Sequence, residues 1–131
     1  MIGIDTNILV RYLAQDDPAQ ARRVEAFLST ALDDGTRLKV DDIVLCELVW
    51  VLRAAYRLGK ATIVEALDKV MSTAIFSFDD RELLRVALHD YREGTGDFSD
   101  YVIGRRNARA GCEHTVTFDR ALGNEPSFVL L

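Results

Sequence analysis

The chain has 131 residues, a length that fits one domain, and 49% of them are hydrophobic, which argues against extensive disorder. Its 21 Asp and Glu residues outnumber its 16 Lys and Arg residues, so the formal net charge of −5 argues, by itself, against a nucleic-acid partner. No apolar run approaches the roughly 18 residues of a membrane span, and Asp5 interrupts the only stretch that resembles a secretion signal.

The cysteines point to a reducing environment. Cys46 and Cys112 lie far apart and form no CxxC motif, so we expect two buried, reduced thiols in a cytoplasmic protein. With only two cysteines and two histidines, the chain does not suit a zinc site of the His/Cys type. Any metal ion would therefore be held by oxygen.

Short apolar runs alternate with amphipathic stretches in the first half of the chain. Helix starts are marked by capping residues such as Asp17, which is followed by a proline, and a stop is marked by Gly35. In chain order, the predicted elements are a strand over residues 1–4, a helix that ends at residue 13, a helix from residue 17 to Gly35, a strand over residues 38–40, and a strongly apolar helix over residues 43–56 that begins at Asp41 and Asp42 and is closed by Gly59.

The same alternation continues in the second half. Gly94 and Gly96 mark a loop, and Gly111 is placed as a helix C-cap. In chain order, the predicted elements are a helix around residues 63–71, a strand over residues 74–78, a helix from residues 79–80 through Tyr91, a helix from Asp97 or Ser99 to about residue 110, and strands over residues 113–118 and 128–131.

Alternating strands and helices predict an α/β fold: a three-layer α/β/α sandwich with a central, mainly parallel sheet in a single domain, residues 1–131. Ligands of such sheets bind at the carboxyl ends of the strands. Asp5 follows the first strand and Asp119 follows the strand that ends at Phe118, so both carboxylates belong to that edge. Taken singly, each is also explained as a helix N-cap.

Glu47 is harder to explain structurally. Four apolar residues precede it and five follow it, and a helix of this kind is expected to be largely buried. Arg53, six positions downstream, faces elsewhere because helical neighbours are three or four residues apart. Glu47 therefore pairs with a distant arginine, stays protonated, or belongs to a metal or catalytic site.

Asp97 and Asp100 open the next helix, three residues apart, and can share one face or form a capping box. If the sheet edge gathers Asp5, Glu47, Asp100 and Asp119, their mutual repulsion requires raised pKa values or a bound cation. Hard oxygen ligands select Mg²⁺ or Mn²⁺, which work on phosphate esters. Without these four acids and Asp97, the chain would carry 16 acids and 16 bases, so its net charge can be assigned to one pocket.

These residues resemble the motifs of the PIN domain. The opening resembles the family in residues 1–7, and three further motifs follow in order: Glu47 in its apolar helix, residues 97–103, and residues 115–120. The resemblance covers essentially the whole chain and is nearest to VapC-type ribonuclease toxins of toxin–antitoxin pairs. One small departure is Asp42, where relatives often have Ser or Thr.

The resemblance implies an α/β/α sandwich and an endoribonuclease that depends on Mg²⁺ or Mn²⁺ and cleaves single-stranded or looped RNA. It places Asp5, Glu47, Asp100 and Asp119 at the four acidic positions of the family and makes Asp97 an auxiliary acid. We expect Asp5 and Asp100 to hold the principal ion. Glu47 and Asp119 then complete the site, or hold a second ion when the substrate brings its phosphate. The resemblance also implies hydroxyl positions beside the site at Thr6 and Thr117, a VapB-type antitoxin partner and a homodimer.

Arginines are the candidates for RNA contacts. Arg105 and Arg109 share a face of the helix that carries Asp100 and are expected to contact RNA phosphates, an antitoxin carboxylate or solvent. Weaker candidates are Arg11 and the pair Arg22 and Arg23. The aromatic residues Tyr12, Trp50 and Tyr56 fit a dimer or antitoxin groove, although core packing is the simpler expectation for Trp50.

Two other classes fit parts of the pattern. A phosphoacceptor signalling domain would have a second acid beside Asp5 and a lysine near the last strand, but the last lysine of this chain is Lys69. A PIN-like metal- or RNA-binding module without catalysis stays open. A metal titration followed by an RNA cleavage assay separates that module from a nuclease.

Overall fold

Aspartate side chains start most of the helices in the computed structural model, which describes residues 1–131. An N-cap carboxylate accepts a hydrogen bond from a free N–H of the first turn and thereby fixes where a helix begins. The aspartate N-caps are Asp5, Asp17, Asp41, Asp80 and Asp97 for five α-helices, and Asp119 for a short 3₁₀ helix. Six of the 21 acidic side chains are therefore explained by local hydrogen bonds at helix starts.

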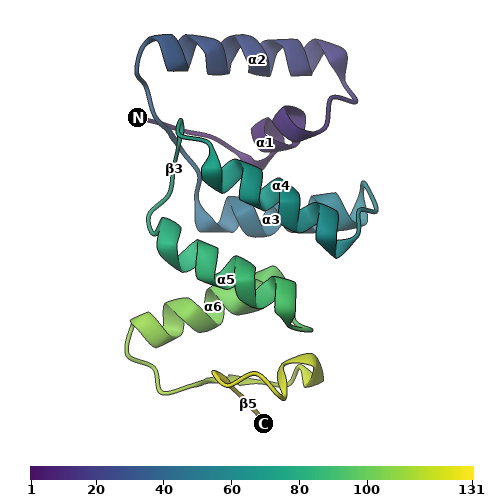
Figure 1. Ribbon diagram of the computed structural model, residues 1–131, viewed down its shortest axis with the longest axis vertical. Helices are drawn as coiled ribbons and strands as arrows, with labels where there is room; N and C mark the ends of the chain where they lie inside the picture. The colour runs from purple at the N-terminus through teal and green to yellow at the C-terminus, as the bar shows by residue number, and fades with distance from the viewer. The chain divides into compact units, whose positions relative to one another are not determined.

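The chain forms two units, Met1–Asp79 and Asp80–Leu131. The first unit holds three short strands and four helices, whose order is followed by colour in Figure 1. In chain order they are β1 (Ile2–Gly3), α1 (Thr6–Leu13), α2 (Pro18–Asp33), β2 (Leu38–Lys39), α3 (Asp42–Ala54), α4 (Lys60–Ser72) and β3 (Phe76–Ser77). The strands pair in parallel in the order β1-β2-β3.

The second unit holds two helices, a 3₁₀ turn and two strands. In chain order they are α5 (Arg81–Glu93), α6 (Phe98–Arg109), β4 (Thr115–Thr117), η1 (Arg120–Leu122) and β5 (Phe128–Leu130). β4 and β5 also pair in parallel, with Thr115 opposite Phe128. The predicted α/β fold with parallel strands is confirmed, and its strands are hydrogen-bonded as one sheet in each unit. That residues 1–131 form one domain stays a prediction.

The core of each unit comes from the apolar stripes of its helices. In the first unit, α1 packs against α2 and α3, and α3 packs against α4, which buries residues such as Leu9, Leu48 and Leu67 completely. In the second unit, α5 packs against α6, and the side chain of Phe98 is completely buried. None of the helices combines the length and the apolar character needed to cross a membrane.

The expectation for the cysteines is wrong in one respect. Both thiols are free, but Cys112 is exposed and Cys46 is only half-buried. Cys112 follows Gly111, whose φ of +96° turns the chain out of α6 into the loop before β4, so no element covers the thiol.

Candidate functional site

Asp5 lies at the junction of β1 and α1, where the sequence places it. Its Oδ1 atom accepts a hydrogen bond of 2.7 Å from the backbone N–H of Thr6, and its Oδ2 atom has no partner. The Thr6 hydroxyl beside it is buried and makes no hydrogen bond. A buried polar atom without a partner is uncommon in a folded protein. The Thr6 hydroxyl is therefore available for a hydrogen bond next to the exposed carboxylate of Asp5.

Glu47 lies on α3, but the expectation that it is buried is wrong. Its side chain is exposed and has no hydrogen-bond or ion-pair partner. Ile43 and Trp50, four residues before and three after it, are 63% and 45% exposed, so all three share one outward stripe of the helix. The expectation that Trp50 packs in the core is wrong for the same reason.

Asp97 and Asp100 form the predicted capping box at the start of α6. The Asp97 carboxylate accepts from the N–H of Phe98 at 2.8 Å, and the Oδ2 atom of Asp100 accepts from the N–H of Asp97 at 2.9 Å. Burial raises the pKa of Asp100, and the charges of Asp97 and Asp119 raise it further, against the opposing effect of that hydrogen bond. Three carboxylates of the second unit therefore influence one another.

Asp119 follows β4 and caps η1. Its Oδ1 atom accepts from the N–H of Ala121 at 2.9 Å, and its own N–H donates to the Thr117 hydroxyl at 3.0 Å. The Thr117 hydroxyl thus accepts a hydrogen bond from the backbone that carries Asp119. That this hydroxyl orders water or a carboxylate stays a prediction. The 3₁₀ helix itself was not predicted, because a single turn has no periodicity to detect.

The carboxylates suit a hard cation by their chemistry. Asp5, Asp100 and Asp119 each use one oxygen for a backbone cap and keep the other oxygen free, and Glu47 keeps both. A cap also holds each carboxylate in a defined orientation. Oxygen donors of this kind suit Mg²⁺ or Mn²⁺. Neither unit by itself gathers three His, Cys, Asp or Glu side chains in an arrangement that could hold a metal ion.

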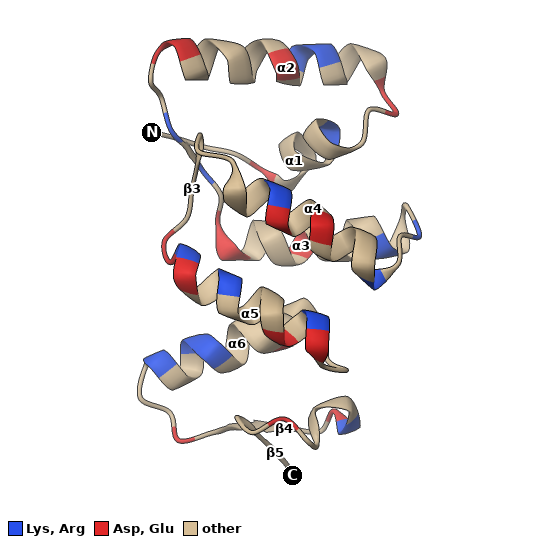
Figure 2. Cartoon of the chain, in the orientation of Figure 1, with Lys and Arg blue, Asp and Glu red and all other residues tan.

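The arginines of α6 have structural partners. Basic residues follow one another along the second half of this helix (Figure 2). Arg105 forms a bidentate ion pair with Asp90 of α5, with N–O distances of 2.7 and 2.9 Å, and Arg109 forms an ion pair with Asp80. Both arginines therefore join α6 to α5, and any role toward RNA stays a prediction.

Tyr101 is a residue whose role the sequence does not reveal. Its hydroxyl accepts from the N–H of Gly96 at 2.9 Å and donates to Glu125 at 2.8 Å. Through these two hydrogen bonds, Tyr101 links the loop before Asp97 to the segment after η1. It thereby connects the segments that flank Asp100 and Asp119. Because Glu125 is 24 residues away, no local pattern signals this contact.

Comparison with known proteins decides the family. The family model for the PIN domain matches residues 2–124 and so spans both units. The chain belongs to the PIN domain family. The resemblance to PIN domains that the four motifs indicate is thereby confirmed.

A curated relative agrees with this assignment. The PIN chain is 24% identical, over 117 residues, to a VapC ribonuclease of Aquifex aeolicus (strain VF5). The similarity covers 89% of this chain and 86% of the relative, so it extends over nearly the whole of both proteins.

Proposed function

We propose that this PIN protein is an endoribonuclease that depends on Mg²⁺ or Mn²⁺ and acts as the toxin of a VapBC-type pair. The observation that carries the proposal is the match to the PIN family over residues 2–124, together with similarity to a VapC ribonuclease over 89% of the chain. The substrate is single-stranded or looped RNA in the cytoplasm, and the partners are a VapB-type antitoxin and a second copy of the chain.

Four carboxylates carry the reaction in this proposal. Asp5 and Asp100 hold the principal cation, Glu47 and Asp119 complete the acidic set, and Asp97 is auxiliary. A divalent cation held there lowers the pKa of water and offsets the charge that develops on the phosphate. The free carboxylate oxygens of Asp5, Asp100 and Asp119 support these roles, because a capped carboxylate is already oriented before a ligand arrives.

The neighbouring residues have positioning roles. Thr117 holds the backbone of Asp119 through the hydrogen bond described above. The buried Thr6 hydroxyl, which has no partner, supplies a hydrogen bond to water or to a carboxylate when substrate is bound. Arg105 and Arg109 contribute positive charge that RNA phosphates can approach, while they stay paired with α5.

The experiment that tests the proposal is RNA cleavage by the purified protein with and without added metal. We expect structured RNA with exposed loops to be cut in Mg²⁺ or Mn²⁺, cutting to stop in EDTA, and a co-expressed antitoxin to suppress it. Metal binding without any RNA cleavage would instead identify a PIN-like binding module.

A further inference from the structure

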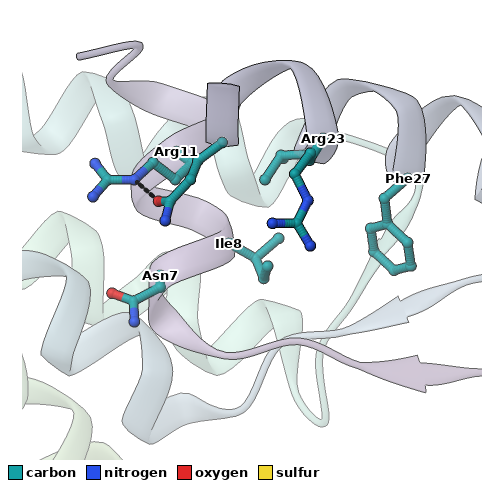
Figure 3. A pocket seen from close by; sticks show the side chains of 7 residues that line it. Asn7, Ile8, Arg11, Arg23 and Phe27 are labelled. Atoms are coloured by element: carbon teal, nitrogen blue, oxygen red, sulfur yellow. Dashed lines mark hydrogen bonds between the residues drawn. The ribbon is translucent and has the colours of Figure 1, made fainter. Parts of the chain in front are cut away.

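A cavity between α1 and α2 has a charge opposite to that of the chain as a whole. Its volume is about 340 Å³. Two arginines, Arg11 and Arg23, and two amides, Asn7 and Gln20, line it together with apolar side chains that include Phe27 (Figure 3). No acidic residue lines the cavity, although the chain carries a net charge of −5.

Arg11 is held in place as one wall of the cavity. Its Nε–H donates to the side-chain oxygen of Gln20 at 2.6 Å, and its Nη1 group donates to Asp16 at 2.8 Å. Tyr56 donates to the other oxygen of Asp16 at 2.9 Å, which completes the network. Because the Gln20 oxygen faces Arg11, the NH₂ group of the same amide stays available as a donor.

Arg23 is the cation that the cavity leaves unused. It is exposed and makes no hydrogen bond or ion pair. Figure 3 shows its side chain reaching from α2 toward Ile8 of α1, while the Arg11 guanidinium turns away from it. An arginine without a partner, in a cavity that no carboxylate lines, suits a phosphate, because the planar guanidinium can donate two parallel hydrogen bonds.

The cavity also lies close along the chain to a proposed catalytic residue. Asp5 caps α1, and Asn7 and Arg11 follow it on the same helix. At a rise of about 1.5 Å per residue, these two positions lie roughly 3 and 9 Å along the helix axis from Asp5. A duplex strand advances about 3.4 Å per nucleotide along its axis, and a single strand is at least as extended, so about one to three nucleotides cover that span.

We propose that this cavity binds a nucleotide of the RNA substrate within about one to three positions of the one that is cut. Arg23 and the free Gln20 amide hold a phosphate, and the base lies against Phe27 and Ile8, since bases stack on aromatic side chains without sequence preference. A volume of about 340 Å³ lies within the range of small-ligand sites. The inference rests on the proposed function, because it takes RNA as the substrate.

The test compares two adjacent arginines of α2, of which only Arg23 lines the cavity between α1 and α2. Arg23 lines the cavity and Arg22 does not, yet both are exposed and neither has a partner. Each is changed to Gln in the Asp5→Asn background, which retains its cap but is expected not to cut RNA. Binding of a fluorescent single-stranded RNA in Mg²⁺ is followed by anisotropy at two salt concentrations.

We expect Arg23→Gln to weaken RNA binding about tenfold and to lower the slope of log affinity against log salt by about 0.7, the value for one lost phosphate contact on a single strand. Arg22→Gln should weaken binding by less than about twofold. If both substitutions weaken RNA binding equally, the arginines attract RNA only through nonspecific electrostatics, and the inference is overturned. So would an unchanged RNA affinity of Arg23→Gln combined with weaker binding to the antitoxin, which would assign the cavity to a protein partner.

The proposed function fails in a different way. If the wild-type protein cuts no RNA and the Asp5→Asn protein binds none, the nuclease assignment itself is contradicted, and the inference falls with it. If RNA is cut by the wild type and bound by the Asp5→Asn protein, but Arg23→Gln binds RNA as tightly, only the inference is overturned.

Discussion

Removing the hydroxyl of Tyr101 tests whether one buried contact holds the surroundings of Asp100 and Asp119. In Tyr101→Phe the ring remains and only the oxygen is lost. The N–H of Gly96 then loses its acceptor, and Glu125 loses a donor. Because Gly96 and Tyr101 are both buried, water does not readily replace the lost partner of the N–H.

The cost follows from these two losses. A buried donor left without a partner costs about 1–3 kcal/mol. Glu125 is only half-buried and can turn to solvent, so its loss adds little. We therefore expect Tyr101→Phe to lower the free energy of unfolding by about 1–3 kcal/mol. RNA cleavage should fall as well, because the loop before Asp97 is no longer tied to Glu125.

The measurement is urea denaturation, with Tyr12→Phe as the matched control. Tyr12 contacts Phe76 and Lys69 through its ring, and its hydroxyl makes no hydrogen bond. Tyr12→Phe therefore removes the same hydroxyl oxygen at a position where it has no hydrogen-bond partner. It should change the free energy of unfolding by less than about 0.5 kcal/mol. If Tyr101→Phe falls within the same limit, the hydroxyl does not contribute to stability as described.

Three further predictions concern charge. The pKa of Asp100 is raised in the folded state, so the stability that this residue contributes is present in acid and is lost as pH rises through that pKa. Asp100→Asn should therefore be at least as stable as the wild type at neutral pH. A clear loss of stability there would contradict this prediction. Arg105→Gln and Asp90→Asn remove the same exposed ion pair and should each cost at most about 1 kcal/mol, less in high salt, but only Arg105→Gln should weaken RNA cleavage if this arginine contacts RNA. Saturating Mg²⁺, at 100 times its Kd, should stabilise the wild type by about 2.7 kcal/mol, and a melting temperature that does not respond to Mg²⁺ would count against the metal site.

Local chemistry made much of the fold predictable. Asp17, Asp41 and Asp97 cap the helices that they were predicted to start, because the signal for an N-cap lies in neighbouring residues. Gly35 and Gly111 adopt the positive φ angles expected of glycines that end helices. The capping explanation and the catalytic proposal for Asp100 do not compete, because the capping box uses only its Oδ2 atom.

Burial was predicted less well, because it depends on packing. The run of apolar residues around Glu47 suggested a helix covered on all sides, but the spacing of Ile43, Glu47 and Trp50 places them on one exposed stripe. The partners of Arg105 and Arg109 could not be predicted either. Both come from α5 through the packing of two helices, which no short motif encodes.

The most direct test of the metal-dependent nuclease is a series of Asp→Asn variants assayed for both stability and cleavage. Asparagine keeps the oxygen that caps a helix and removes only the charge, so Asp5→Asn and Asp100→Asn should fold normally. Asp34→Asn, at an exposed carboxylate without a partner, is the control. We predict that Mg²⁺-dependent RNA cleavage is lost in the first two variants and retained in the third. Full cleavage by Asp5→Asn or Asp100→Asn would contradict the proposed site.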